Sequence, residues 1–206
     1  MLVIGLTGGI ASGKTTVSDL LARKGAHVIN ADLLGHESYR SGTPTWQEVV
    51  DTFGPEIVGA DGEIDRKELG RIVFSDAAAR QKLNGIVWPA IRRLMEARLP
   101  ELRQRGAPKV VVLEAALLIE AVWYDLADEV WLVTVSEEEA IQRLVSRNGL
   151  SQEEALKRIR SQLSDEERRR YAQVVIGNSG TLEALEAAVQ RQWELLQRRL
   201  HSGTRV

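Results

Sequence analysis

The chain has 206 residues, of which 44% are hydrophobic and 27% charged, and its formal net charge is −2. This length and composition predict one globular domain with insertions and enough apolar side chains for a full core. The lack of cysteine excludes disulfides and cysteine metal sites, and the slightly negative charge argues against broad electrostatic binding to nucleic acid.

Short apolar strands alternate with longer helical segments, which is typical of a parallel α/β sheet. The expected strands are Val3–Leu6, Ala26–Ile29, Val110–Leu113, Val130–Val133 and Val174–Ile176. Helices are expected at about 14–24, 137–147, 151–163 and 181–200. No apolar run reaches the length of a membrane span and no signal-peptide pattern follows Met1, so we expect a soluble, cytoplasmic protein.

The strongest motif lies at the start of the chain. The apolar run Leu2–Leu6 precedes the sequence Gly8-Gly9-Ile10-Ala11-Ser12-Gly13-Lys14-Thr15, and apolar residues at helical spacing follow it. This is the P-loop pattern between a strand and a helix, the context that the pattern needs. Backbone N–H groups then turn toward phosphate oxygens, Lys14 can reach the β- and γ-phosphates, and the Thr15 hydroxyl can ligate Mg²⁺. The sequence therefore predicts a site for a nucleoside triphosphate.

A long helical interval separates the second strand from the third. Its expected helices are Thr45–Thr52, Arg66–Val73, Asp76–Ile86 and Ala90–Gln104. An insertion at this point of a nucleotide-binding sheet lies near the carboxyl ends of the strands, so we expect it to hold the second substrate. Asp65 is expected to cap a helix whose first turn contains Arg66, where a cation is unfavourable without an anionic ligand or a partner such as Asp61. The aromatic side chains of the interval are Trp46, Phe53, Phe74 and Trp88. Most of them are expected in the core, while one or two could stack on a base or line an apolar groove.

The region after the fourth strand is rich in arginine. Arg143 and Arg147 lie on the helix that ends at an Asn148-Gly149 turn, which could act as the hinge of a lid. Arginines on a mobile lid can clamp phosphates and stabilise the charge that develops during phosphoryl transfer. The run Arg168–Arg170 is expected to be a solvated helix face.

Carboxylates follow two strands of the predicted sheet. Asp32, after the second strand, can orient an attacking hydroxyl or water, or it can cap a helix that begins at Leu33, and both roles remain open. Glu114 ends the third strand, where a carboxylate can hold Mg²⁺ through a water; the alternative is an exposed loop acid. Glu120, further along the loop, is a less favoured candidate for the same role.

Taken together, these segments resemble the dephospho-coenzyme A kinase family over nearly the whole chain. The matching segments are Gly5–Ile10 with Ser12–Thr15, Val28–Asp32, Phe53-Gly54, Asp61–Arg66, Val73-Phe74, Leu117–Glu120, Arg143 with Arg147, Arg158-Ile159 with Gln162, and Val175–Asn178. The Asp-Gly-x-Ile-Asp-Arg segment followed by the lid pattern is much more specific than the P-loop, which many unrelated proteins share.

The resemblance implies that ATP phosphorylates the ribose 3′-hydroxyl of dephospho-coenzyme A, with Mg²⁺ as cofactor. It implies a three-layer P-loop kinase fold with a five-stranded parallel sheet flanked by helices. A nucleotide-binding core (1–38, 108–142 and 172–206) would carry a helical substrate insertion (39–107) and a helical lid (143–171). The implied partners are ATP and dephospho-coenzyme A, without nucleic acid or membrane, in a monomer or weak homo-oligomer.

The resemblance also implies roles for individual residues. By position, the catalytic residues are Asp32, Lys14 and Arg143, and the metal residues are Thr15 and Glu114. Nucleotide-binding residues are Gly8, Gly9, Ile10, Ala11, Ser12, Gly13, Lys14, Thr15, Thr16, Arg147 and Asn178. Substrate-binding residues are Thr7, Asp32, Arg66, Trp88 and Leu117.

The chain departs from the family pattern at several positions. Trp88 stands where the family has a histidine, and Glu114 and Ala116 stand for the aspartate and proline of an Asp-x-Pro sequence. Ala140 replaces a glutamine, and Gln173 and Asn30 each replace an aspartate. These changes bear on acceptor affinity and metal binding. Two alternatives therefore remain: a related P-loop kinase for another small hydroxyl or nucleotide acceptor, and a non-catalytic nucleotide-binding regulator. A GTPase is disfavoured because no Asn-Lys-x-Asp segment is present.

Overall fold

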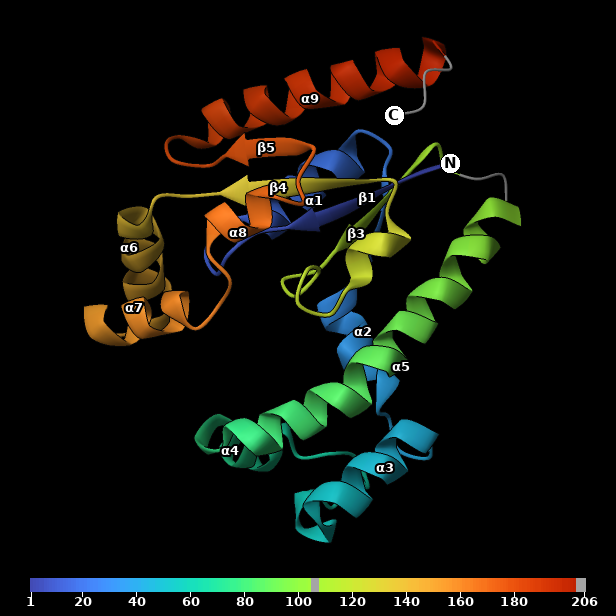
Figure 1. The fold of residues 1–206 in the computed structure, drawn as a ribbon, viewed down its shortest axis with the longest axis vertical. Coiled ribbons are helices and arrows are strands. Elements are labelled where there is room, and N and C mark those ends of the chain that lie inside the picture. Colours follow the sequence, from blue (N-terminus) through green and yellow to red (C-terminus); the bar gives the residue numbers. More distant parts are fainter. Residues whose placement is uncertain (105–107, 203–206) are drawn as a thin grey trace. The chain divides into compact units, whose positions relative to one another are not determined.

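The structure is a computed structural model that describes residues 1–104 and 108–202 (Figure 1). Its contacts divide the described chain into two compact units. The first unit comprises residues 1–29 and the described chain from residue 108 onward, and it contains the P-loop; the second comprises residues 30–104 and is built of helices. No helix among the described residues is both long enough and apolar enough to cross a membrane.

The described strands form one five-stranded sheet in the order β2-β3-β1-β4-β5. Their bounds are β1 Leu2–Thr7, β2 His27–Asn30, β3 Val110–Glu114, β4 Glu129–Thr134 and β5 Val174–Gly177. The central strand β1 pairs in parallel with β3 and with β4, and β4 pairs in parallel with β5. Strands covered on both faces read as continuous apolar runs, as β3 and β4 do, and the five predicted strands are confirmed.

The helices of the first unit are α1 Lys14–Arg23, α6 Glu137–Asn148, α7 Gln152–Arg160, α8 Asp165–Arg169 and α9 Leu182–Ser202, with a 3₁₀ turn, η2, at Trp123–Leu126. Of these, α1, α8 and α9 contact strands of the sheet, whereas α6 and α7 contact each other. Buried side chains of α1 and α9 pack with apolar residues of the sheet in one cluster, in which Leu21, Val189 and Leu196 meet Ile4 and Trp131. The α9 helix therefore packs on the sheet.

The predicted helix at 151–163 is wrong in extent. The structure contains two shorter helices, α7 and α8, each starting after a serine that forms a capping box with a glutamate: Ser151 with Glu154, and Ser164 with Glu167. A capping box satisfies two backbone groups at a helix start, so a second box inside a helical stretch marks a new helix. This signal is present in the sequence and would have located α8.

The second unit consists of helices α2 Ala31–Ser38, α3 Pro44–Phe53, α4 Arg66–Ser75 and α5 Ala77–Gln104, with a 3₁₀ turn, η1, at Pro55–Ile57. The long helix α5 contacts α2, α3 and α4, and it replaces the two helices predicted on either side of Pro89. A proline removes one helical hydrogen bond and disfavours a helix interior. The helix continues because residues on both sides of Pro89 bury one apolar face, including Val87, Ile91 and Met95.

Phe74 is the aromatic side chain of this unit that does not pack in the core. Its side chain lies near the end of α4 and is 84% exposed. By contrast, Trp46 places its indole nitrogen in the interior. The sequence could not identify Phe74 as the exception because spacing along a short helix does not specify which face meets a neighbouring helix.

Candidate functional site

Two glycines of the P-loop occupy positions that a side chain could not share. A Cβ on Gly8 would lie 2.3 Å from the carbonyl oxygen of Val133. Gly13 has φ +90°, and a Cβ there would lie 2.2 Å from Nδ2 of Asn178. Left-handed backbone and close approach both favour glycine. These glycines let the loop pass tightly between β1 and α1, the arrangement that the motif predicts.

The loop's carbonyl oxygens accept hydrogen bonds from side chains of the same unit. Nζ of Lys14 donates to the carbonyls of Gly8 at 2.8 Å and Gly9 at 3.2 Å. An ammonium that lies on these carbonyls at the start of a helix adds positive charge where the helix dipole is also positive. Such a loop is suited to hold anionic phosphate groups.

Arg143 and Asn178 hold the next part of the loop in the same way. Nη1 of Arg143 donates to the Ala11 carbonyl at 3.1 Å, and its Nη2 donates to the Asn178 carbonyl at 2.7 Å. Nδ2 of Asn178 donates to the Ser12 carbonyl at 2.7 Å. The structure therefore brings together three predicted site residues that lie far apart in the sequence: Lys14, Arg143 and Asn178.

The two predicted metal residues are also in contact. Oγ1 of Thr15 donates to Oε1 of Glu114 at 2.8 Å, and Oγ of Ser18 donates to Oε2 at 2.7 Å. Glu114 is 3% exposed, so the alternative of an exposed loop acid is wrong. The sequence did not identify Ser18, although its position three residues after Thr15 places both hydroxyls on one face of α1.

The donor set at this position fits a magnesium ion that keeps most of its water. Mg²⁺ prefers oxygen ligands and is bound in kinases by one or two protein groups together with substrate phosphates. Thr15 and Glu114 supply hydroxyl and carboxylate oxygens next to the P-loop. Among residues 1–104 and 108–202, no group of three or more His, Cys, Asp or Glu side chains could hold a metal ion by itself.

Other predicted residues of the first unit lie around the loop with different exposures. Thr7 is fully buried, and its Oγ1 has no hydrogen-bond partner in the described part of the chain. Thr16 and Leu117 are half-buried, whereas Arg147 is exposed on α6.

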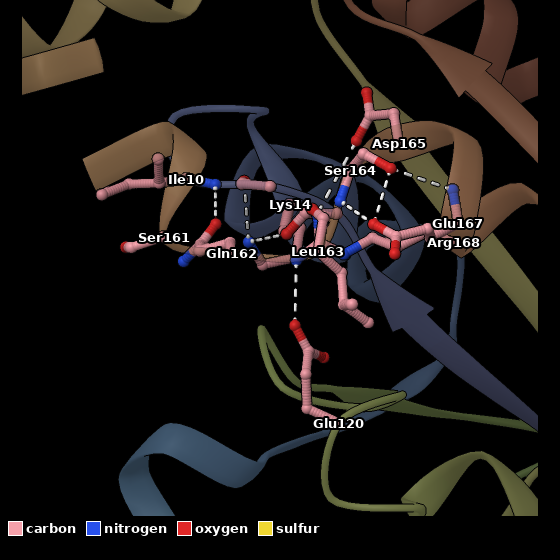
Figure 2. Close-up of polar contacts among 12 residues, drawn as sticks. Ile10, Lys14, Glu120, Ser161, Gln162, Leu163, Ser164, Asp165, Glu167 and Arg168 are labelled. Carbon is pink, nitrogen blue, oxygen red and sulfur yellow. Dashed lines mark hydrogen bonds and ion pairs between the residues drawn. The ribbon is translucent and has the colours of Figure 1, made fainter. Parts of the chain in front are cut away.

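The segment after α7 and the helix α8 make contacts around the P-loop that the sequence did not predict (Figure 2). Oε1 of Gln162 accepts a hydrogen bond from the Ile10 N–H at 2.8 Å. Arg168 is 1% exposed and donates through Nη2 to Oε1 of Glu120 at 3.2 Å, so the expected solvated face is wrong for this arginine. Burial raises the pKa of Asp165, and the charges of Arg168, Arg169 and Lys14 oppose that shift. A cavity of about 480 Å³ lies beside these residues, Gly9 and Ser12.

In the second unit, Asp32 lies in the first turn of α2 and is exposed. The helix starts at Ala31, and the side chain of Asn30 accepts the N–H of Leu33 as its cap. The capping role considered for Asp32 is therefore wrong, because the residue two positions earlier fills it. Asp32 remains a carboxylate at the start of a helix that follows β2 directly.

Arg66 occupies the first turn of α4, and Asp65 caps that helix, as predicted. The partner of Arg66 is not Asp61: Nη1 lies 3.0 Å from Nε2 of His36, and the guanidinium also hydrogen-bonds Tyr39. Partial burial and the Arg66 charge lower the pKa of His36, while Asp32 raises it. The unit thus brings Asp32, His36 and Arg66 into electrostatic contact.

Trp88 lies half-buried on α5.

The family profile and the sequence relatives of this chain agree on one family. The sequence profile described as "Dephospho-CoA kinase" matches residues 2–184. A dephospho-CoA kinase of Geobacter sulfurreducens is 51% identical over 193 residues, covering 94% of this chain and 98% of its own length. One of Moorella thermoacetica is 44% identical over 200 residues, covering 97% and 94%. A crystal structure from Thermus thermophilus has a TM-score of 0.77 at 38% identity, covering 95% and 97%. The chain, with its P-loop kinase fold, belongs to the dephospho-CoA kinase family.

Proposed function

We propose that this protein transfers the γ-phosphoryl group of ATP to the ribose 3′-hydroxyl of dephospho-coenzyme A, which yields coenzyme A and ADP. The observation that carries the proposal is the P-loop of a dephospho-CoA kinase family member, with its carbonyls held by Lys14, Arg143 and Asn178. Phosphoryl transfer requires mainly positioning and charge stabilisation, and this loop supplies both.

Lys14, Thr15 and Glu114 form the phosphate and metal side of the proposed site. Lys14 carries the charge that would stabilise the transferring phosphoryl group, and Thr15 with Glu114 would hold Mg²⁺. The ion held there would neutralise the charge that develops on the phosphate groups. The contact between Thr15 and Glu114 orients the threonine hydroxyl, and the buried carboxylate keeps negative charge next to the ion's expected position.

Asp32 is the proposed group that orients the acceptor hydroxyl and takes its proton. Its support is chemical: an exposed carboxylate at the N-terminus of a helix, which stabilises the ionised form that a base requires. Arg66, whose hydrogen-bond partners are the uncharged groups of His36 and Tyr39, is the proposed cation for the anionic acceptor. Thr7, Trp88 and Leu117 are proposed to contribute to acceptor binding.

Arg143, which donates to carbonyls of and beside the P-loop, is proposed to stabilise the transferring phosphoryl group, with Arg147 and Thr16 contributing to nucleotide binding. We also propose that residues 39–107 serve as the substrate insertion and 143–171 as the lid. The expected setting is the cytoplasm, with ATP, dephospho-coenzyme A and Mg²⁺ as partners in a monomer or weak homo-oligomer.

The decisive experiment is ADP release with ATP, Mg²⁺ and dephospho-coenzyme A, with the product identified by mass. We expect a product that carries one added phosphate, and we expect the Lys14→Ala variant to form none. A panel of other hydroxyl and nucleotide acceptors tests the alternative that the enzyme phosphorylates a different substrate. The replacements at Trp88 and Glu114 motivate this alternative. ATP binding without turnover on any acceptor would contradict the proposal and favour a nucleotide-binding regulator.

A further inference from the structure

The residues from Gln162 to Arg168 lie within the proposed lid and against the P-loop backbone, and the proposed function gives none of them an individual role (Figure 2). The Ile10 N–H donates to Oε1 of Gln162 at 2.8 Å. A Cβ placed on Gly9 would lie 3.7 Å from Nη1 of Arg168, 3.9 Å from Oδ1 of Asp165 and 3.9 Å from Oε1 of Gln162. Three side chains of this segment therefore converge on one turn of the P-loop.

Arg168 is buried, unlike its neighbours on the same short stretch of chain. Its exposed fraction is 1%, whereas Arg169 and Arg170 are exposed. A buried charge is costly unless it is paired and hydrogen-bonded. Glu120 supplies the pairing, with its Oε1 3.2 Å from Nη2, and Oδ1 of Asp165 lies 3.8 Å from Nη1. The location of this guanidinium is thus set by a specific partner and not by solvent.

The same guanidinium holds the backbone next to Gln162. Nη1 of Arg168 donates to the carbonyl of Leu163, the residue that follows Gln162 directly. Glu120 lies in the loop after β3, a strand of the sheet that also carries the P-loop. A continuous series of contacts therefore runs from Glu120 through Arg168 and Leu163 to Gln162, and from Gln162 to the Ile10 amide.

We propose that Arg168 is a positioning residue: paired with Glu120, it holds Gln162 on the Ile10 amide and so fixes the Gly9–Ile10 turn of the P-loop for phosphoryl transfer. Its effect on catalysis rests on the proposed kinase function, whereas the hydrogen bond to the Ile10 amide does not. A buried pair that fixes a segment restricts the geometry of the groups which that segment touches, and small losses of such geometry are costly in rate.

Hydrogen exchange at the Ile10 amide tests the contact without any substrate. Gln162→Met removes the acceptor oxygen at similar length, and Glu120→Ala removes the partner of Arg168. We expect both variants to exchange the Ile10 amide about tenfold faster, the effect of losing one hydrogen bond. Amides of β1 serve as an internal reference for global opening. Arg170→Gln, which changes an exposed arginine two residues away, should leave the exchange unchanged.

The outcomes separate a positioning role from a general structural one. Faster exchange at Ile10 in Gln162→Met but not in Glu120→Ala would overturn the proposal, as would faster exchange at β1 and Ile10 alike. Arg168→Met, which removes the cation and its donors but retains an apolar side chain, keeps the test valid if Glu120→Ala does not fold. The Ile10 amide of Arg168→Met should exchange as fast as that of Glu120→Ala.

Kinetics supply the second measurement. Gln162→Met and Glu120→Ala should each lower kcat about tenfold and change KM for ATP by less than about twofold, while the double variant falls little further because both act through one contact. Additive losses of kcat would overturn the positioning role. If no variant and not even the parent protein phosphorylated dephospho-coenzyme A, the kinase proposal would fail, while the exchange data would still test whether Arg168 holds the loop.

Discussion

Thr15 donates its hydroxyl hydrogen to the buried carboxylate of Glu114 across 2.8 Å, while Ser18 donates to the other oxygen of the same group at 2.7 Å. Both oxygens of the carboxylate thereby accept hydrogen bonds from side chains of α1, the helix that starts at the P-loop. A carboxylate held in this way can orient the threonine hydroxyl and a metal-bound water together.

Glu114→Gln tests the metal role of this carboxylate. The substitution keeps size and hydrogen-bonding oxygen but removes the negative charge. We expect the Mg²⁺ concentration for half-maximal rate to rise roughly 10- to 100-fold, as for lost outer partners of metal ligands. The rate of ADP release measured at increasing Mg²⁺ concentration tests this expectation. Ser18→Ala, which leaves the charge in place, should have a smaller effect. Equal Mg²⁺ dependence in Glu114→Gln and the parent protein would exclude the carboxylate from the metal site.

Asp32→Asn tests the proposed base. We expect turnover to fall by roughly 10²–10⁴-fold, the usual contribution of a positioned acid–base group, with ATP affinity unchanged. The measurements are steady-state kinetics and ATP binding by calorimetry. Asp19→Asn, an exposed carboxylate on α1, is the matched control and should retain full activity. Undiminished turnover in Asp32→Asn would remove the residue from the mechanism.

Arg143→Gln tests whether the guanidinium acts on the reaction or only on the loop. We expect kcat to fall about 10²-fold, a typical loss for an electrostatic group in the transition state, with a much smaller rise in the ATP dissociation constant. Arg143→Lys retains charge but not both hydrogen bonds, so comparison of the two variants separates charge from geometry. A loss confined to ATP affinity would restrict Arg143 to holding the Ala11 and Asn178 carbonyls.

The pKa of His36 provides a pH-dependent test of the Arg66 contact. Partial burial, then the Arg66 charge, hold this pKa below the ordinary value of 6.5. Between the folded pKa and 6.5, the unfolded chain binds more protons. The free energy of unfolding therefore rises with pH in that window, and this contribution is lost as the pH falls through it.

Arg66→Gln should move the pKa of His36 upward, toward 6.5, and weaken the pH dependence of stability below pH 6.5. NMR titration of the imidazole measures the first effect, and denaturant unfolding at several pH values measures the second. Lys67→Gln removes the next cation on α4, which does not contribute to the pKa shift of His36, and is the control. An unchanged titration in Arg66→Gln would contradict the contact.

Two adjacent leucines of α9 test how the C-terminal helix packs. Leu196 is fully buried in the sheet cluster, whereas Leu195 is 49% exposed. We expect Leu196→Ala to lower the free energy of unfolding by about 2–5 kcal/mol, the usual loss for a buried leucine. Leu195→Ala should change it by less than about 0.5 kcal/mol. Chemical denaturation of both variants measures the difference. Equal losses in the free energy of unfolding would contradict the packing of the Leu196 face of α9 on the sheet.

The sequence by itself determined the sheet and the nucleotide motif. Its strands are continuous apolar runs, and the glycines and lysine of the P-loop occur between a strand and a helix, so local pattern was sufficient. Local signals also identified Asp65 as a cap and the helix that carries Arg143, whereas Asn178 was expected only from the resemblance to the family. The capping box that starts α8 was equally visible in the sequence, although the extent of that helix was predicted wrongly.

Tertiary structure decided what periodicity and spacing could not. The α5 helix continues through Pro89 because its buried face packs on three other helices, and Phe74, near the end of α4, is exposed. Arg168 is buried and its two neighbours are not, a distinction that depends on Glu120, 48 residues away. Runs of like charge predict solvent exposure only on average. A single partner from a distant loop changes the outcome, because pairing offsets the desolvation of one charge and not of its neighbours.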